Sequence, residues 1–254
     1  MGADPTIDDV TSDAAPADAA PADPRAAEAS SATRPTVTVE VWSDVVCPWC
    51  YIGKRRFEAG RELAGDLGVD LEITYKPFQL DPRAAPGVAG PVFDAYVKKF
   101  GGPEEAHRII DHVTSTAAED GLEFRMDRAL RANTLLAHRL LWWAGRDDTP
   151  VAQETMKERL LQAYFIDGAH VGDPEQLADL AAELGADRDE VATFLASEEG
   201  VDDVAAELQH AYENGITAVP TYVFDGTWAV PGAQDPEMFA RVLGRMAEKA
   251  LSPS

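Results

Sequence analysis

Two cysteines stand at a spacing that suits reversible disulfide chemistry. Cys47 and Cys50, the only cysteines of the chain, lie in the segment Asp44-Val45-Val46-Cys47-Pro48-Trp49-Cys50. Because a first-turn proline needs no N–H partner, Pro48 predicts a helix that begins directly after Cys47. Free N–H groups and the helix dipole there favour a thiolate, which makes Cys47 the nucleophile. Cys50, one turn further along, would attack a mixed disulfide on Cys47 and release the product.

Three other roles for the two cysteines fit the sequence less well. A zinc site needs about four ligands, and neither a second Cys pair nor a tight His spacing occurs among His107, His112, His138, His170 and His210. A purely structural disulfide would close so short a loop that it would add little stability. Inert cysteines are common in protein cores, but a helix N-terminus argues against inertness. The sequence therefore predicts redox chemistry and no metal.

A strand, a helix and a second strand are predicted to position the two thiols. The run Val37–Ser43 is rich in β-branched and aromatic residues and predicts a strand. The helix is predicted over Pro48–Leu67, with Leu63 on its apolar side and Gly68 as its stop. Alternating apolar residues predict a strand over Val69–Tyr75. This order is typical of a βαβ unit with a right-handed crossover.

The stretch from about Gly90 to Gly215 shows no convincing strand pattern, and its segments carry helix signals instead. Asp173-Pro174-Glu175-Gln176 combines an N-cap, a first-turn proline and a capping-box glutamine. Asn133–Ala144 carries an apolar stripe, and Val201–Asn214 ends before a glycine. We expect about five or six helices inserted into the sheet domain.

The sheet is predicted to resume near the C-terminus, over Thr217–Phe224. Asp225-Gly226 fits a type I′ turn, after which Thr227–Val230 returns as an antiparallel strand. Asp235-Pro236-Glu237 caps a last helix and completes a ββα unit. Val219-Pro220 precedes a strand that we expect to be central, where a trans proline would be out of place. A cis proline at the entry to the strand would resolve this conflict.

Several short motifs, taken in order, are similar to those of a known group of proteins. They are Asp44-x-x-Cys47-Pro48-Trp49-Cys50-Tyr51-x-Gly53, Pro77-Phe78-x-Leu80-x-Pro82, Asn133-Thr134-x-x-Ala137-His138, Ala218-Val219-Pro220 and Gly232-Ala233-Gln234. Together with the predicted helical insertion, they resemble the DsbA-like branch of the thioredoxin superfamily and, within it, the FrnE-type family of thiol oxidoreductases. The resemblance spans about residues 37–251, and Cys-Pro-Trp-Cys is its most specific part.

The resemblance implies an α/β, thioredoxin-like fold with a large all-helical insertion and a substrate groove between the two parts. The thioredoxin-like domain would comprise residues 36–85 and 216–251, and the inserted helical domain residues 86–215. Kappa-class glutathione transferases and hydroxychromene-carboxylate isomerases resemble this architecture but carry serine at the position of Cys47. The cysteine found here therefore favours disulfide exchange.

The resemblance also assigns roles to individual residues. It implies that Cys47 attacks and Cys50 resolves, and that Pro220 lies against the disulfide and keeps metals away from the thiolates. The backbone of Val219 would pair there with an extended substrate. The substrate-binding residues implied beside Val219 and Pro220 are Trp49, Pro48 and Phe78.

Other side chains near these motifs are open to more than one interpretation. Asp44 either assists proton transfer or caps the turn before Cys47. His138 is either an active-site residue or a satisfied core histidine. Lys54, Arg55 and Arg56 are most simply a solvated helix face, which would add a positive field near Cys47.

Composition narrows the surroundings in which the chain works. Its 254 residues, 45% of them hydrophobic, are enough for a core, and its net charge of −23 repels nucleic acid and anionic lipid. No run approaches the 18 or so apolar residues of a membrane span, and no signal-peptide pattern is present. Two cysteines form no disulfide framework. We therefore expect a cytoplasmic protein, with no nucleic-acid or membrane partner. Residues 1–35 predict a disordered acidic tail rich in Ala and Pro.

These observations predict a thiol–disulfide oxidoreductase of the protein disulfide oxidoreductase or isomerase type, which cycles the Cys47–Cys50 pair between dithiol and disulfide. It would hold no cofactor, and a low-molecular-weight thiol or a partner reductase would exchange the electrons. Its substrate would be a protein or small molecule with a thiol or disulfide, and it would act as a monomer or homodimer. Two alternatives stay open. One is a glutathione- or other thiol-dependent transferase or isomerase with Cys50 dispensable, and the other is a non-catalytic peptide-binding module.

Overall fold

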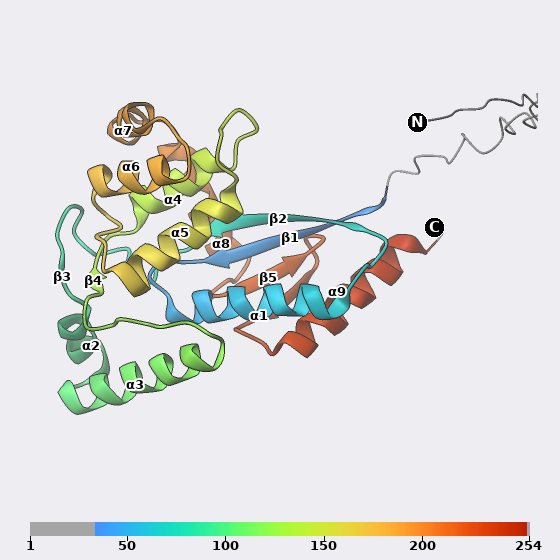
Figure 1. Cartoon of the computed structure of the whole chain (residues 1–254), viewed down its shortest axis with the longest axis horizontal. Helices are drawn as coiled ribbons and strands as arrows, with labels where there is room; N and C mark the ends of the chain where they lie inside the picture. The colour runs from blue at the N-terminus through green and yellow to red at the C-terminus, as the bar shows by residue number, and fades with distance from the viewer. Residues whose placement is uncertain (1–33, 253–254) are drawn as a thin grey trace, which may run out of the picture. The chain divides into compact units, whose positions relative to one another are not determined.

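A four-stranded sheet carries the Cys-containing helix in the computed structural model, which describes residues 34–252 (Figure 1). The strand order is β2-β1-β5-β6, formed by Thr36–Ser43 (β1), Asp70–Pro77 (β2), Thr221–Phe224 (β5) and Trp228–Pro231 (β6). β1 pairs in parallel with β2 and antiparallel with β5, and β5 pairs antiparallel with β6. The predicted βαβ unit and C-terminal hairpin are both confirmed.

Two long helices lie side by side along one face of the sheet, α1 (Pro48–Ala64) and α9 (Pro236–Leu251) (Figure 1). Apolar side chains fill the space between them and the strands, among them Val39, Val41, Phe57, Tyr222, Phe224 and Phe239. Gly60 allows the two helices to approach closely, because a Cβ at this position would lie 2.6 Å from the Cβ of Phe239. The sheet and these helices hold the start of α1 in a fixed position.

The predicted end of α1 and its apolar side need correction. The helix ends at Ala64, because Gly65 adopts a φ of 64° and its N–H bonds to the carbonyl of Glu62. Leu67 and Gly68 therefore lie beyond the helix. Leu63 is 61% exposed, so it does not belong to the buried side.

Within the described residues, the chain between β2 and β5 forms one short π-helix, η2 (Ala163–Asp167), and seven α-helices. They are α2 (Val92–Phe100), α3 (Pro103–Glu119), α4 (Leu135–Ala144), α5 (Gln153–Gln162), α6 (Pro174–Glu183), α7 (Arg188–Ala196) and α8 (Val201–Glu213). The expected number was too low, in part because Gly101 and Gly102, with φ of 92° and 142°, separate α2 from α3. A short strand pair, β3 (Gly90–Pro91) with β4 (Leu130–Arg131), was also not predicted.

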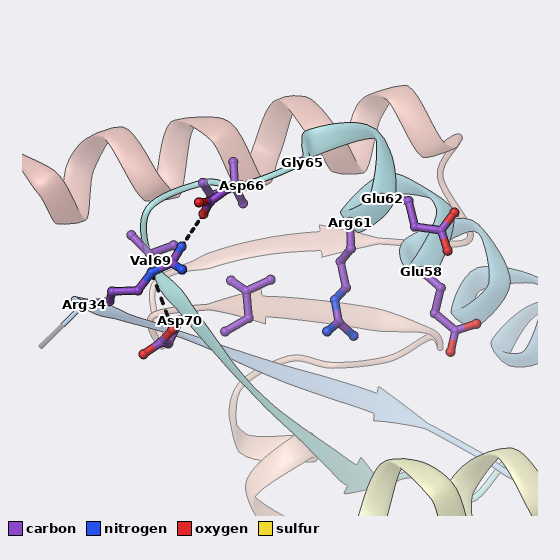
Figure 2. Close-up of a pocket in the computed structure, with 10 residues that line it drawn as sticks. Arg34, Glu58, Arg61, Glu62, Gly65, Asp66, Val69 and Asp70 are labelled. Atoms are coloured by element: carbon purple, nitrogen blue, oxygen red, sulfur yellow. Dashed lines mark hydrogen bonds and ion pairs between the residues drawn. The ribbon is translucent and has the colours of Figure 1, made fainter. Parts of the chain in front are cut away.

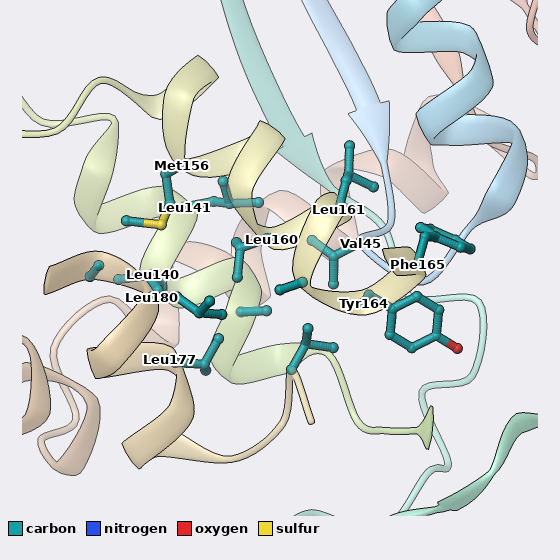
Figure 3. Packing of buried hydrophobic residues seen from close by; sticks show 14 of the residues in the cluster. Val45, Leu140, Leu141, Met156, Leu160, Leu161, Tyr164, Phe165, Leu177 and Leu180 are labelled. Atoms are coloured by element: carbon teal, nitrogen blue, oxygen red, sulfur yellow. The ribbon is translucent and has the colours of Figure 1, made fainter. Parts of the chain in front are cut away.

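The helices of the insertion enclose a second apolar core, which Figure 3 shows from close by. Leu140 of α4, Leu160 of α5 and Leu177 of α6 are fully buried in it. Val45, two residues before Cys47, points into the same core. The turn that leads to the cysteines is therefore anchored in the insertion as well as in the sheet.

Local signals near the ends of the elements were mostly accurate. Asp173 caps α6 as predicted, but the side chain of Gln176 accepts the N–H of His170 at 2.9 Å instead of closing a capping box. Asp225 and Gly226 have φ of 46° and 63°, as a type I′ turn requires. The prediction placed the start of this strand at residue 217, but β5 begins at Thr221, which pairs with Trp42 of β1.

Residues 1–33 of the predicted tail lie outside the described residues, and the domain bounds at 85/86 and 215/216 stay a prediction.

Arg34, before β1, pairs with Asp66 and with Asp70, and the Nε of Arg34 lies 3.7 Å from Oδ1 of Asp70. These residues line a charged hollow of about 580 Å³ at the end of α1 that is remote from Cys47 (Figure 2). No helix in the described part of the chain is long and apolar enough to cross a membrane.

The free edge of β2 is occupied by one side chain of α5. The N–H of Tyr75 donates to Oε1 of Gln153 at 2.7 Å, and Nε2 of Gln153 donates to the carbonyl of Tyr75 at 3.2 Å. The Gln153 amide thus takes the position that the peptide group of a neighbouring strand would take.

Candidate active site

Cys47 is the N-cap residue of α1, as the position of Pro48 predicts. Its backbone is extended, with φ −88° and ψ 116°, and its carbonyl accepts the N–H groups of Cys50 at 3.0 Å and Tyr51 at 3.4 Å. The N–H of Cys47 in turn donates to the carbonyl of Asp44 at 3.3 Å. A tight turn followed by a helix therefore fixes the thiol at the positive end of the α1 dipole.

Cys50 lies deeper, in the first turn of α1. Both cysteines are 3% exposed, and no disulfide joins them in this structure. Burial raises the pKa of the Cys50 thiol well above its usual value, and the hydrogen bond and charge of Cys47 act in the same direction. The charge of Lys157 and a hydrogen bond from the backbone of Asp44 oppose this shift. The Cys50 thiol is therefore held mainly in its protonated form.

Val219 and Pro220 face the first cysteine. The Sγ of Cys47 donates to the carbonyl oxygen of Val219 at 3.7 Å, and the Val219–Pro220 peptide bond is cis. Pro220 is buried, and Val219 is half-buried just before β5. The structure therefore places these predicted residues beside the nucleophile.

Asp44 and His138 lie in a buried network behind the turn. Oδ1 of Asp44 is 3.2 Å from Nε2 of His138, and Oδ2 accepts the N–H of Leu80 at 2.8 Å. The same His138 nitrogen lies 3.0 Å from the carbonyl of Phe78. These contacts join the turn before Cys47 to α4 and to the segment after β2.

A cavity of about 730 Å³ lies next to Cys47. Val46, the residue before the nucleophile, lines it together with Tyr96 of α2 and Tyr164. Burial raises the pKa of the Tyr96 hydroxyl to about 12, and the charge of Cys47 acts in the same direction. The cavity therefore adjoins the turn that leads to Cys47. Trp49 does not line it, because its ring packs 5.8 Å from that of His112 in α3.

The cavity gathers positive charge in a strongly acidic chain. Arg83, Lys98, Lys99 and Arg131 line it, against the carboxylates of Asp81 and Asp94. Arg131 is paired with Asp81 at 2.6 Å. Among residues 34–252, no carboxylate lies within ion-pair distance of Lys98 or Lys99, so their charges are available to a ligand.

The interpretation of Lys54, Arg55 and Arg56 as a solvated face is wrong. Lys54 is 4% exposed and pairs with Glu58 and, at 2.8 Å, with Glu158 of α5. Arg55 shares these two carboxylates, and Arg56 donates to Asp120 at 2.8 Å. The three cations tie α1 to the insertion and the carboxylates neutralise them.

The sequence reasoning missed Lys157, a buried cation of α5. It lies on α5, 1% exposed, and its charge acts on Cys50, Asp44 and Cys47. A signal was present, because Lys157 precedes Leu160, Leu161 and Tyr164 by three, four and seven residues. That spacing places a lysine on an apolar helix face.

The fold is thioredoxin-like, with a helical insertion. Its sheet carries the Cys pair at the start of α1 and a cis proline before β5, and the seven described α-helices α2–α8 lie between β2 and β5. Residues 38–244 match the family model of the DSBA-like thioredoxin domain, so the chain belongs to this family. Both the α/β fold class and the family resemblance inferred from the motifs are confirmed.

Individual relatives agree with this assignment. The chain is 30% identical over 216 residues to protein YwbO of Bacillus subtilis (strain 168), which covers 84% of this chain and 99% of YwbO. A probable DsbA oxidoreductase from Streptomyces coelicolor superposes with a TM-score of 0.75 at 33% identity, over 86% of this chain and 92% of that one. A 2-hydroxychromene-2-carboxylate isomerase shares the fold at 19% identity, with a TM-score of 0.61 over 85% of this chain and all of that one (100%).

Proposed function

We propose that the protein is a thiol–disulfide oxidoreductase in which Cys47 attacks and Cys50 resolves. The observation that carries this proposal is the position of the two sulfurs. Cys47 caps α1 beside a cavity, whereas Cys50 is buried in the first turn of the helix, where its N–H donates to the carbonyl of Cys47. A sulfur bound to Cys47 would therefore extend into the cavity, with Cys50 behind it.

The reaction proceeds in two exchanges of sulfur partners. The Cys47 thiolate attacks a substrate disulfide, one substrate sulfur leaves as a thiolate, and the other forms a mixed disulfide with Cys47. Cys50 then loses its proton and attacks Cys47 Sγ, which releases the second substrate thiolate and leaves the Cys47–Cys50 disulfide. Run backwards, the same steps oxidise a dithiol. No bound cofactor takes part, and a low-molecular-weight thiol or a partner reductase would restore the starting state.

The groups around Cys47 have separate tasks in this scheme. The carbonyl of Val219 faces the attacking sulfur, so an extended substrate would lie along the backbone before β5. Pro48 and Pro220 are buried, and Trp49, whose ring packs against His112, would contact a substrate from the side of α3. Phe78 contributes through its carbonyl, which holds His138.

The cysteines can be separated by two matched substitutions. Cys47→Ser is expected to abolish reduction of a model disulfide and to form no adduct. Cys50→Ser is expected to accumulate a mixed disulfide at Cys47, visible by mass spectrometry of the intact protein. Full turnover by Cys50→Ser would contradict the proposal and would favour a transferase or isomerase that needs only one thiol. Unchanged peptide binding with both cysteines replaced, and no turnover by the unmodified protein, would favour a binding module.

A further inference from the structure

One buried charge near the cysteines has no role in the scheme above. Lys157 of α5 is 1% exposed, and among the described residues its Nζ has no hydrogen-bond partner. The ammonium lies over the ring of Tyr75, 5.7 Å from its centroid. An unpaired buried ammonium is costly, because burial removes its hydration without returning a counter-charge. The position therefore offers a cation to a negative charge that arises only during the reaction.

The residue after Lys157 joins α5 to the first turns of α1, which contain Cys50. Glu158, the next residue, accepts the hydroxyl of Tyr51 at 2.7 Å and pairs with Lys54 at 2.8 Å. These partners follow Cys50 by one and four residues, and Lys54, four residues on, lies on the same side of α1 as Cys50. Lys157 precedes Glu158 in the sequence but takes no part in its contacts with Tyr51 and Lys54.

Charged and titratable groups surround Lys157 on several elements. The titratable and charged groups that face it or its immediate partners are Asp44 before α1, Cys47, Cys50 and Lys54 on α1, Tyr75 on β2, Tyr222 on β5, and Glu154 and Glu158 on α5. Asp44 is held by His138 and Leu80, and Glu158 by Lys54 and Arg55. The two sulfurs are the groups in this set that acquire negative charge during disulfide exchange.

We propose that Lys157 is a positioning residue for the resolving step, whose buried ammonium balances the thiolate of Cys50. This inference rests on the proposed function. Cys50 releases its proton to water, and its thiolate forms a bond to Cys47 Sγ. The bond between Cys47 Sγ and the substrate sulfur breaks, and the electron pair leaves with the substrate thiolate. Lys157 acts through Cys50 and contacts no substrate.

The protonation equilibria agree with this assignment. Burial lowers the pKa of the Lys157 ammonium to about 8, while the charges of Cys50, Asp44 and Cys47 oppose the shift. The ammonium is therefore the main form at neutral pH, and it is lost above about pH 8. Lys157 in turn lowers the pKa of the Cys50 thiol against the larger effect of burial.

The resolving step can be timed with the dianionic reagent 5,5′-dithiobis(2-nitrobenzoate). The reduced full-length protein is mixed with one equivalent by stopped flow. A first release of coloured thiolate reports attack by Cys47, and a second reports attack by Cys50 on the mixed disulfide. Both rates are measured from pH 5 to 9 for the unmodified chain and for Lys157→Met, Lys157→Arg and Lys76→Met. Lys76 is a matched control, since it lies next to Tyr75 and is paired with Glu207 at 2.6 Å.

In Lys157→Met we expect the second phase to slow about tenfold at pH 7 and its midpoint to move to higher pH, since one pKa unit changes the thiolate fraction tenfold. The first phase should change less than about twofold, because Lys157 has a larger effect on the buried sulfur. Lys157→Arg should recover most of the rate, and Lys76→Met should match the unmodified chain. An unaltered second phase in Lys157→Met would overturn the proposal. Absence of a second phase in the unmodified chain would overturn the proposed function itself.

A second measurement uses no variant and so does not depend on the folding of Lys157→Met. The chain has six lysines, so ¹³C,¹⁵N-labelled lysine gives a spectrum simple enough to titrate. We expect the Lys157 ammonium to lose its proton at lower pH in the disulfide form than in the dithiol form, because the disulfide carries no thiolate. Lys76 and Lys249 should titrate alike in both forms. Identical titration of Lys157 in both forms would overturn the proposal.

Discussion

The Oδ1 atom of Asp44 lies 3.2 Å from Nε2 of His138, and both side chains are 1% exposed. The other carboxylate oxygen accepts the N–H of Leu80 at 2.8 Å. One buried side chain thus joins the turn before Cys47 to α4 and to the segment after β2. Of the two roles open to Asp44 and His138 in the sequence, these contacts favour structural ones.

Asp44→Ala is therefore expected to destabilise the fold. The change leaves the Leu80 N–H without its acceptor and leaves the His138 ring only the carbonyl of Phe78, which should lower the free energy of unfolding by about 2–3 kcal/mol. Urea denaturation followed by circular dichroism measures this difference. Asp44→Asn keeps an oxygen for Leu80 and should lose less. A change below about 0.5 kcal/mol in Asp44→Ala would contradict the structural role.

The ion cluster around Glu158 gives a prediction about pH. Burial alone would raise the pKa of the Glu158 carboxyl, but the hydrogen bond and charge of Lys54 outweigh it and lower the pKa. A carboxyl whose pKa is lower in the folded state stabilises the fold above its unfolded pKa of about 4.3, and this contribution is lost as pH falls through the folded pKa.

Glu158→Gln should accordingly lower the free energy of unfolding by about 2 kcal/mol at pH 7, because it leaves the buried Lys54 with one carboxylate fewer. The loss should shrink toward pH 3, where the native carboxyl is itself protonated. Urea midpoints from pH 3 to 7 measure both effects. Glu183→Gln is the control, since Glu183 is an exposed partner of Arg159 and should change stability by less than about 0.5 kcal/mol. Equal losses of stability in the two variants would contradict a larger contribution from the ion cluster around Glu158 than from an exposed ion pair.

Lys98 and Lys99 predict a preference for anionic substrates. Replacing both with glutamate reverses the charge at the rim of the cavity beside Cys47. The rate of the first exchange with 5,5′-dithiobis(2-nitrobenzoate) should fall about tenfold at low salt, and the difference should narrow in molar salt. The neutral bis(2-hydroxyethyl) disulfide should react at an unchanged rate. Lys249→Glu, on α9, controls for net charge, and an equal loss there would assign the effect to the whole surface.

Two glycines give opposite predictions for the same substitution. In Gly60→Ala the new Cβ would meet Phe239 at 2.6 Å and the carbonyl of Pro236 at 2.8 Å, so α9 must move away from α1. We expect a loss of about 1–3 kcal/mol. Gly244, in α9, has no atom within 4 Å of that position, and Gly244→Ala should stabilise the helix by about 0.5–1 kcal/mol. Thermal unfolding distinguishes the two, and destabilisation by both would contradict the packing described here.

The fold could be predicted largely from local patterns. Alternation in Val69–Tyr75 and the proline before Trp49 each depend on neighbours in sequence, and both predicted elements are present. The ends of helices were harder to predict. Gly65 and Gly68 are equally good helix stops by residue type, so the sequence alone does not show that α1 ends before Gly65. The separation of α2 from α3 could have been predicted from Gly101-Gly102, because two consecutive glycines favour a helix break.

The candidate site was predictable only in the part that is contiguous in sequence. Cys47, Cys50 and the Val219–Pro220 motif have recognisable neighbours, whereas the partners of Lys54 lie 104 residues further on at Glu158, as well as nearby at Glu58. Charge type alone cannot distinguish a solvated lysine from a buried one. Lys157 could have been noticed from its place on an apolar helix face, but its proximity to Cys50 depends on how α5 packs.

Gln153 has a consequence for how copies of this protein meet one another. An open edge strand invites a strand from a second molecule, which is a common start of aggregation. At the end of β2 near the cysteines, the Gln153 amide already occupies both backbone groups of Tyr75. A single side chain therefore blocks edge-to-edge self-association at this point. A residue without an amide at position 153 would leave the N–H and the carbonyl of Tyr75 free to pair with a strand of a second molecule.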